Sequence, residues 1–405
     1  MSWPEVRLDE VVEIGRGSSP RPIKDERYFI NGNIPWVKIA DATVSGKTIY
    51  KTNQYVNEFG ASFSRHLKKD SVILSASGVS LGIPRILGVD ACIHDGWLYF
   101  SNFNGIDSGW LYYRLILLKD YFLGIANGAA IQNINTEMLR ETKIGLPDID
   151  VQKKIASILS NYDDLIQTNQ QRIVLLEEAA QRLYDEWFVK LRFPNHEQVP
   201  VVDGVPEGWE RVDLSEIAYI NKKSIKKDEF QSIRYIDISS VGERKIDSYF
   251  DVLIADAAGR AKRKVTHGDI IWSCVRPNRR QYALMWQPLD NVIVSTGFCT
   301  LTAKGVTFVY LYLLTTDKNF SDYLENVATG AAYPAVTASD FESYQTLKPT
   351  NDILDRFNLL TLPLIEQAET LKIMSQKLAQ ARDALLPRLM SGKMDVSGLS
   401  LKEIA

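Results

Sequence analysis

The stretch DVQKKIASILSNYDDLIQTNQQRIVLLEEAAQRLYDEWFVK, from Asp150 to Lys190, decides the fold of this chain. Its core-type positions follow one another at alternating steps of four and three residues, which is the pattern of a coiled-coil seam. No proline or glycine interrupts it, so we expect a single helix of roughly 60 Å at ~1.5 Å per residue. A helix this polar is only marginally stable alone, so its seam needs a partner.

The segment from Asp352 to Met390 supplies that partner. Adding 202 to each position of the first seam gives a second, patchier seam, with Pro363 near its start. We expect the two helices to pair antiparallel, since a parallel pairing would need a linker that spans the helix length. Pro387 should break or kink the second helix. The predicted seam residues are Ile155, Leu159, Tyr162, Ile166, Asn169, Ile173, Leu176, Leu183, Leu364, Leu371, Leu378 and Leu385.

Asn169 is the polar residue of the first seam. A buried asparagine at such a position fixes the alignment of two helices at a cost in stability. Alternatively, Asn169 lies at a wet edge of the seam. The sequence leaves both possibilities open.

Composition places the chain among soluble globular proteins of two or three domains. Of its 405 residues, 45% are hydrophobic and 24% are charged. No apolar run approaches the ~20 residues of a membrane span, and the start MSWPEVRLDE lacks the layout of a signal peptide. The three cysteines show no metal-ligand spacing, which is typical of thiols in a reducing cytoplasm. The net charge of −3 gives no global sign of nucleic-acid binding, so any basic footprint must be local.

The chain is also a direct repeat of two halves. WPEVRLDEVVEI at Trp3 returns as WERVDLSEIAYI at Trp209, and ANGAAIQNIN at Ala126 aligns with ATGAAYPAVT at Ala328. Each half is therefore predicted to be a mixed α/β domain followed by a long helix, an α+β fold with a pseudo-twofold internal repeat. The predicted segments are a domain at 1–149, a helix at 150–190, a linker at 191–207, a domain at 208–350, a helix at 351–390 and a tail at 391–405.

These features together resemble the specificity (S) subunit of type I restriction-modification enzymes. The resemblance covers essentially the whole chain and rests on the opening WPEVRLDEVVEIGRGSSP, on NGAAIQNINTEMLRETKIGLPDIDVQKKIASIL, on VRPNRR and STGF, and on the closing ALLPRLMSGKMDV. It implies two target-recognition domains that each read one half of a split sequence in double-stranded DNA, with the paired helices as a ruler for the gap.

The resemblance also implies partners. Two methyltransferase subunits, which use S-adenosylmethionine, would dock around the helices, and motor-nuclease subunits would join for restriction. This chain would then hold no cofactor, reside in the cytoplasm, and direct methylation and cleavage by its partners. The alternative is a coiled-coil scaffold that joins two proteins, which would not require a one-sided basic region.

Candidate DNA contacts in the second half gather around VRPNRR. Planar guanidinium and amide groups suit guanine and adenine edges, because both can form bidentate hydrogen bonds. A solvated, charged strand edge is the alternative explanation. The candidates are Lys222, Lys223, Arg263, Arg276, Asn278, Arg279, Arg280 and Tyr333.

The first half is less basic. Its Gly/Pro/Ser loop after the first strand-like segment commonly approaches DNA in the resembled family, and small residues replace the arginines of VRPNRR. The amides near Gly128 suit adenine, although an ordinary helix C-cap turn would explain that loop equally well. The candidates are Arg16, Ser18, Ser19, Arg21, Lys24, Ser77, Ser80, Arg85, Gln132 and Asn133.

No catalytic motif emerges from the sequence. The adenine methyltransferase signature N/D-P-P-Y/F is missing, and GKT at Gly46 lacks the upstream glycine of a phosphate-binding loop. Asp237, Glu243 and Lys245 imitate the D…E-x-K arrangement of metal-dependent nucleases, but the other half has no equivalent glutamate. We therefore expect a subunit without catalytic or metal-binding residues.

Overall fold

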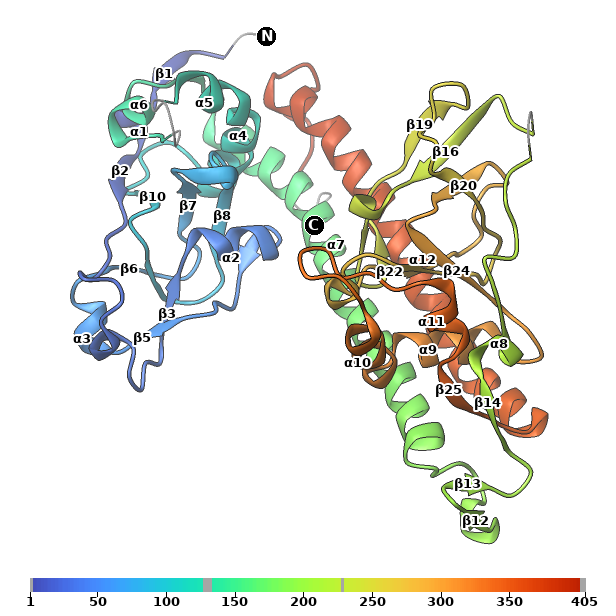
Figure 1. The fold of residues 1–405 in the computed structure, drawn as a ribbon. Coiled ribbons are helices and arrows are strands. Elements are labelled where there is room, and N and C mark those ends of the chain that lie inside the picture. Colours follow the sequence, from blue (N-terminus) through green and yellow to red (C-terminus); the bar gives the residue numbers. More distant parts are fainter. Residues whose placement is uncertain (1–2, 127–132, 227–228, 401–405) are drawn as a thin grey trace. The chain divides into compact units, whose positions relative to one another are not determined.

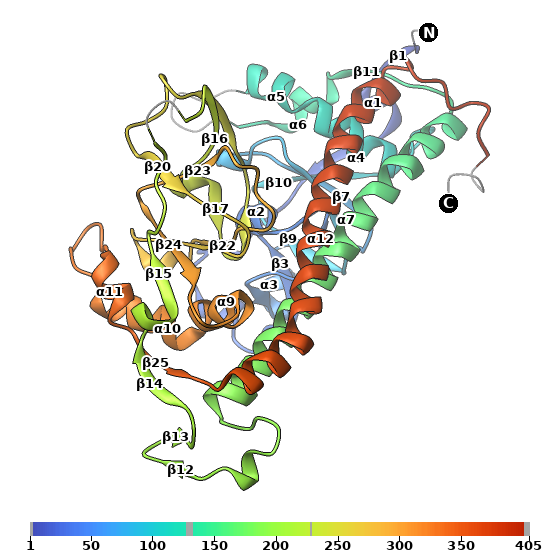
Figure 2. The same cartoon turned by 90° about the vertical axis from the view of Figure 1, so that its right-hand side faces the viewer.

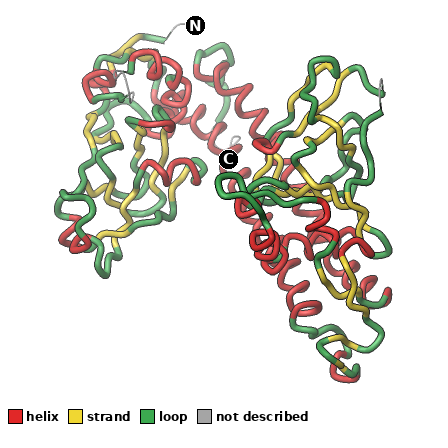
Figure 3. The backbone as a smooth tube through the Cα atoms, in the orientation of Figure 1, coloured by secondary structure: helices red, strands yellow, loops and turns green. Residues whose placement is uncertain are grey.

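The computed structural model describes residues 3–126, 133–226 and 229–400, and the chain divides into two compact units (Figure 1). The first unit contains the chain up to Gln170 together with the segment from Ile373, and the second runs from Gln171 to Lys372. Each unit holds a strand-rich body and a stretch of both long helices (Figure 3). The predicted fold class, two mixed domains with two long helices, is confirmed.

Two sheets and a ribbon form the body of the first unit. One sheet has the strand order β2-β10-β7-β8-β4 and the other β5-β3-β9-β6, while β1 pairs with β11. The pairs β3·β9 and β4·β8 are parallel. The strands are β1 (Glu5–Arg7), β2 (Glu13–Arg16), β3 (Ile34–Val37), β4 (Thr48–Ile49), β5 (Tyr55–Val56), β6 (Arg65–Leu67), β7 (Val72–Ser75), β8 (Pro84–Leu87), β9 (Ala91–Ile93), β10 (Trp97–Ser101) and β11 (Lys143–Gly145).

Helix α4 joins this body to the long helices. Its buried Trp110, Leu111 and Leu115 pack in one apolar cluster with Ile155 and Leu159 of the first long helix. Helix α4 ends at Leu117 and α5 begins at Lys119, with Leu118 between them. The helices of this unit are α1 (Leu8–Val11), η1 (Glu26–Tyr28), α2 (Ile39–Val44), α3 (Glu58–Ala61), η2 (Gly78–Ser80), α4 (Ser108–Leu117), α5 (Lys119–Ile125), α6 (Thr136–Arg140) and the first part of α7 (Ile149–Tyr184).

The second unit has a similar topology, but its first sheet has four strands where that of the first unit has five. Its sheets have the orders β15-β24-β21-β22 and β19-β16-β23-β20, with β16·β23 parallel, and its ribbon is β14·β25. Its strands are β14 (Glu210–Asp213), β15 (Ala218–Ile220), β16 (Ser232–Ile236), β17 (Val241–Gly242), β18 (Lys245–Ile246), β19 (Phe250–Leu253), β20 (Ala261–Lys264), β21 (Ile270–Ser273), β22 (Tyr282–Leu284), β23 (Val292–Ser295), β24 (Phe298–Ala303) and β25 (Gln345–Lys348).

Aromatic side chains fasten the second body to the helices. The ring of Phe188 lies 4.8 Å from that of Tyr310 and 4.7 Å from that of Phe357. Such aromatic pairs stabilise a core beyond the area they bury. The helices of this unit are η3 (a π-helical turn, Asp185–Val189), η4 (His196–Gln198), α8 (Leu214–Ile217), η5 (Ile238–Ser240), η6 (Pro277–Arg279), α9 (Phe308–Thr316), α10 (Lys318–Val327), α11 (Ala338–Glu342) and most of α12 (Asn351–Met390).

The long helices α7 and α12 lie side by side and antiparallel within each unit (Figure 2). In the first unit Arg382 of α12 pairs with Asp163 of α7. In the second, Trp187 lies 5.6 Å from Phe357, so residues late in α7 meet residues early in α12. This direction is the predicted one.

The predicted seam residues all lie in the buried or half-buried part of the pair. Ile155 and Leu159 are completely buried and Leu371 is 5% exposed, while the remaining leucines and isoleucines are half-buried. Asn169 is only 6% exposed. It is therefore a buried polar residue of the seam rather than a residue at a wet edge.

Two details differ from the sequence-based predictions. The helix α12 runs through Pro387 to Met390, so the predicted break is wrong. Leu386, Leu389 and Met390 are buried, and this packing holds the last turn although proline removes one of its hydrogen bonds. The predicted linker also contains a short hairpin, β12 (Val201–Val202) and β13 (Val205–Pro206), whose Asp-Gly turn is a strong local hairpin signal.

A buried ion cluster joins α7, α12 and the second body. The Nζ atom of Lys372 lies 2.8 Å from Glu177 Oε1 on α7 and 2.7 Å from Glu369 Oε1 on its own helix, and it donates to the carbonyl of Arg244 at 2.8 Å. Arg244 in turn donates to Gln181 Oε1 on α7 at 3.0 Å. Unlike an apolar seam, these directional contacts are lost if a helix slides by one turn.

Burial sets the protonation behaviour of this cluster. Burial raises the pKa of Glu369, and Lys372 partly offsets that rise. Burial lowers the pKa of Lys372 itself, but Tyr312, Glu369 and Glu177 outweigh it and raise this pKa above the usual value. The lysine therefore stays charged, and its loss would leave buried carboxylates unpaired.

We predict that Lys372→Met lowers the free energy of unfolding by about 3–5 kcal/mol at pH 7, the typical cost of removing one partner of a buried ion pair. Without Lys372 the folded-state pKa of Glu369 rises further above the unfolded value. The folded variant then takes up a proton more readily than the unfolded chain, so the loss shrinks as the pH falls through that raised pKa. Denaturant unfolding at several pH values between 5 and 8 measures this. Lys377→Met, at an exposed position of α12, is the control, and a loss that does not vary with pH would contradict the prediction.

Candidate nucleic-acid interface

The basic candidates of the second unit surround the single turn η6. This turn follows strand β21. The two residues that flank it have left-handed backbone conformations, with φ of 51° at Arg276 and 50° at Arg280. Such angles are costly for residues with a Cβ and persist where the surroundings hold them. Asn278 and Arg279, inside the turn, are exposed.

A second loop holds Arg276 in place. Its backbone N–H donates to the carbonyl of Pro334 at 2.7 Å, and its Nη2 donates to that of Ala332 at 3.3 Å. The guanidinium lies 4.4 Å from the ring centre of Tyr333, whose side chain is 69% exposed. The half-buried arginine and the exposed tyrosine therefore form one cationic surface, a pair of residue types that suits stacking and bidentate hydrogen bonding.

The three remaining basic candidates lie on or beside strand β20. Ser224 bridges to Arg263 in β20, and exposed Lys222 and Lys223 directly precede it. Lys222 Nζ lies 3.8 Å from the ring centre of Tyr219. Burial raises the pKa of Cys274 to about 11, and nearby Arg263 partly offsets that rise.

Arg280 differs from its neighbours because it has an acidic partner. Its Nε lies 3.3 Å from Glu243 Oε1, and the same oxygen accepts from the hydroxyl of Tyr282 at 3.1 Å. The side chain is thus partly engaged within the protein. Among the η6 candidates, Arg276, Asn278 and Arg279 are the better placed for an external ligand.

In the first unit the candidates converge on a residue that sequence reasoning missed, Asp95. Arg16 Nε donates to the Asp95 carbonyl at 2.7 Å, and Arg21 forms an ion pair with Asp95 Oδ2. Ser19 Oγ donates to Asp95 Oδ1 at 3.2 Å. The acid sits in the turn between β9 and β10, where His94 Nδ1 accepts from the Gly96 N–H at 2.9 Å. Burial lowers the pKa of His94, consistent with that accepting role.

Asn133 brings the remaining loops of the first unit to the same place. Its side-chain oxygen accepts from Arg16 Nη2 at 3.2 Å, and its backbone bridges to Ser77. Ser18 is half-buried and Lys24 is exposed. Gln132 lies outside the described residues. Three segments far apart in sequence thus form one surface.

Two candidates of the first unit do not present a free polar group. Ser80 is 2% exposed. The guanidinium of Arg85 donates to the carbonyl of Ala42 at 3.1 and 2.6 Å and to that of Pro84 at 2.9 Å, and burial lowers its pKa. Both side chains serve the packing of their own domain, so the structure does not support their choice as DNA contacts.

The two surfaces occupy equivalent places in the repeat. In the first unit the backbone N–H of Ala76 donates to the carbonyl of Gly96, and in the second the backbone N–H of Cys274 donates to the carbonyl of Gly297, both at 2.8 Å. Ile134 then donates to Ala76 at 2.8 Å, as Val336 does to Cys274 at 2.9 Å. The same backbone frame therefore carries different side chains in each half.

The nuclease-like residues have separate structural roles. Asp237 caps η5 by accepting from Ser240 N at 2.9 Å, and Lys245 pairs with Asp247 at 2.9 Å. Within residues 3–126, 133–226 and 229–400, no group of three or more His, Cys, Asp or Glu side chains could hold a metal ion.

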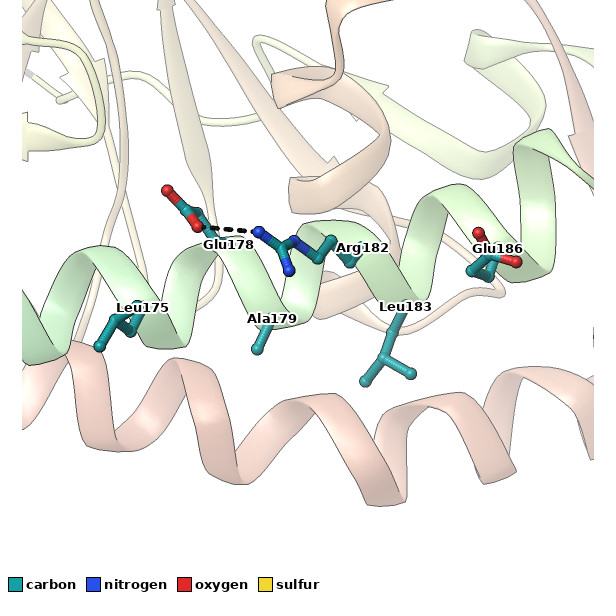
Figure 4. A pocket seen from close by; sticks show the side chains of 6 residues that line it. All are labelled: Leu175, Glu178, Ala179, Arg182, Leu183 and Glu186. Atoms are coloured by element: carbon teal, nitrogen blue, oxygen red, sulfur yellow. Dashed lines mark hydrogen bonds and ion pairs between the residues drawn. The ribbon is translucent and has the colours of Figure 1, made fainter.

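A groove of about 330 Å³ runs along the second part of α7 (Figure 4). Leu175, Ala179 and Leu183 line it one helical turn apart and point toward α12, while Glu178 and Arg182 pair alongside at 3.3 Å. Leu175 is 65% exposed.

Neither the long helices nor any shorter one among the described residues has the length and apolar character that a membrane crossing needs.

Comparisons with known proteins agree with this architecture. Residues 2–178 match the family model described as the type I restriction modification DNA specificity domain. The type I restriction enzyme MjaIX specificity subunit of Methanocaldococcus jannaschii is 23% identical over 411 residues, which cover 98% of this chain and 94% of the relative. The MjaVIII specificity subunit of the same organism is 26% identical over 252 residues, covering 60% and 56%.

A solved structure shows the same fold. The crystal structure of a type I restriction-modification S subunit from M. genitalium aligns with a TM-score of 0.61 at 16% identity and covers 96% of both chains. The internal repeat, the two strand-rich bodies and the paired long helices thus coincide with the sequence matches. Over nearly its whole length the chain is similar to type I restriction enzyme specificity subunits, and its residues 2–178 hold the match to the specificity-domain model.

Proposed function

We propose that this chain is a non-catalytic subunit that reads a bipartite target in double-stranded DNA, one half-site for each unit. The observation that supports this most is the repeated loop frame with different side chains. One frame presents Arg276, Asn278 and Tyr333, and the other presents Arg16 and Asn133. A single frame with two sets of polar groups suits two different short sequences.

The chemistry of each surface indicates how it would read DNA. The guanidinium of Arg276 or Arg279 can donate two hydrogen bonds to a guanine edge, and the amide of Asn278 or Asn133 can pair with adenine. Exposed Lys222 and Lys223 would contact phosphates, which position the protein without specifying sequence. Because the net charge is −3, binding must depend on these local clusters and should weaken with salt.

The helices would set the gap between the half-sites. Each body is fastened to both α7 and α12 by polar contacts, through Arg244 and Lys372 in the second unit and through Asp163 in the first. Asp163 accepts from the hydroxyl of Tyr113 at 2.5 Å and pairs with Arg382. Because each body is fixed at one point along the helix pair, the length of the helices would determine the gap between the half-sites.

The partners would be two methyltransferase subunits bound to the helices, with motor-nuclease subunits added for cleavage. Both helices leave apolar residues exposed: Leu359 is 76% exposed, Leu175 65% and Val174 51%. Exposed apolar side chains along a helix mark a surface for another protein. S-adenosylmethionine would bind to the methyltransferase subunits rather than to this chain, and the complex would act in the cytoplasm.

Methylation of a random-sequence DNA library tests the proposal. The chain is co-purified with its methyltransferase partner, and the modified sites are identified by sequencing. We expect a split motif with one fixed gap. Methylation without sequence preference, or no association with the methyltransferase, would instead favour a scaffold that joins two proteins.

We predict that Arg279→Ala weakens binding to the target by roughly 5- to 150-fold, because a good arginine–base contact contributes about 1–3 kcal/mol. The sequence preference should relax at a position of the second half-site only. Binding titrations at fixed salt and methylation-site sequencing measure the two effects. Arg211→Ala removes another exposed arginine of the same unit and should change neither.

A heptad inserted after Gln170 and another after Lys372 should lengthen the preferred gap between the half-sites while both half-site sequences stay the same. These positions are the boundaries of the two units, so each buried ion cluster remains whole. Seven residues also preserve the apolar seam. An unchanged gap in a complex that still methylates DNA would contradict the role of the helices as a spacer.

A further inference from the structure

Asp95 is an acidic residue in the middle of a surface otherwise made of basic and neutral candidates. Its side chain is 32% exposed, and both of its carboxylate oxygens are in use. Oδ2 pairs with Arg21, and Oδ1 accepts from Ser19 Oγ at 3.2 Å and lies 2.9 Å from His94 Nδ1. A carboxylate near DNA phosphates is repelled by their negative charge, so its presence calls for a compensating interaction within the protein.

The backbone of Asp95 contributes as much as its side chain. Its carbonyl accepts from Arg16 Nε at 2.7 Å, and its N–H donates to Ser19 Oγ at 3.2 Å. Gly17 lies so close to this turn that a Cβ there would be 2.2 Å from the carbonyl oxygen of His94. The loop that carries Arg16, Ser19 and Arg21 is thus attached to the turn around Asp95 at several points.

The second unit has a threonine at the position equivalent to this acid. The carbonyls of Gly96 and Gly297 accept equivalent backbone hydrogen bonds in the two units. The residues directly before these glycines, Asp95 and Thr296, therefore occupy equivalent positions. Thr296 donates its N–H to the carbonyl of Arg260 at 2.8 Å, a backbone contact with no ionic component. The acidic centre is therefore a property of the first surface and does not belong to the shared frame.

We infer that Asp95 is a positioning residue for the first half-site: it orients Arg21 and the loop around it so that they meet the DNA in one arrangement. The inference rests on the proposed function, since it names the residue that gives one of the two surfaces its specificity. A long arginine side chain loses much rotamer freedom when it binds, and an ion pair formed beforehand reduces that loss. Asp95 itself need not touch a base.

The test uses the full chain with its methyltransferase partner and the variant Asp95→Asn. This change keeps the size of the side chain and removes its charge. We expect the preference at the first half-site to fall by roughly tenfold, the scale of one good arginine contact, while the second half-site and the gap stay unchanged. Asp95→Glu, which keeps the charge, should retain part of the preference.

The variant Asp90→Asn provides a matched control. Asp90 is another exposed acid of the same unit, paired with Lys68 at 2.8 Å and accepting from the N–H of Lys69 at 2.8 Å. Its loss should leave both half-sites unaltered. Thermal unfolding of both variants shows whether either has lost structure.

A double-mutant cycle separates positioning from a general effect. If Asp95 acts through Arg21, then adding Asp95→Asn to Arg21→Ala should reduce the preference at the first half-site little further. Additive losses would overturn the inference. So would tighter DNA binding with an unchanged motif, which would mean that Asp95 only repels phosphates. If the wild-type complex yields no split motif, the proposed function fails as well, whereas an intact motif in Asp95→Asn removes the inference alone.

Discussion

The structure depends on polar contacts buried where three elements meet. In the second unit Lys372 lies between Glu177 and Glu369 and also contacts Arg244 of the strand-rich body. In the first, Asp163 links Tyr113 of α4 to Arg382 of α12. An apolar seam tolerates sliding because one leucine resembles the next, but a buried charge without its partner is costly. These contacts therefore restrict each body to one position along the helices.

The repeat explains how one chain can offer two unlike surfaces. Both units share a four-strand order in each of their two sheets, a two-stranded ribbon and the same backbone hydrogen bonds behind the loops, while β4 adds a fifth strand in the first unit only. The loops differ in what they present, an arginine stacked on a tyrosine in one unit and an arginine–amide–carboxylate network in the other. Stability thus resides in the shared frame, and under the proposed function recognition would reside in a few side chains that the frame does not need.

Periodic features of the sequence predicted the fold well. Both long helices form where the seam repeats over many turns: α7 spans Ile149–Tyr184 and continues as the π-helical turn η3 to Val189, and α12 spans Asn351–Met390. Local rules failed where tertiary packing outweighed them, as at Pro387, which the buried last turn of α12 accommodates. The candidate surface was harder to predict. Ser80 in η2 is buried, and Arg85 in strand β8 donates to backbone carbonyls of its own unit. Asp95 meets Arg21 across 74 residues, a contact with no local signal.

The division of the chain between its units has a further consequence. The second unit is one continuous segment, and its ends, Gln171 and Lys372, lie on antiparallel helices that contact each other through Glu177. A segment that leaves and rejoins the chain at neighbouring points can be exchanged as a block without rethreading the rest. Under the proposed function, recombination within the two helix-coding stretches would replace one candidate surface and preserve the other, and new combined specificities would arise from existing halves.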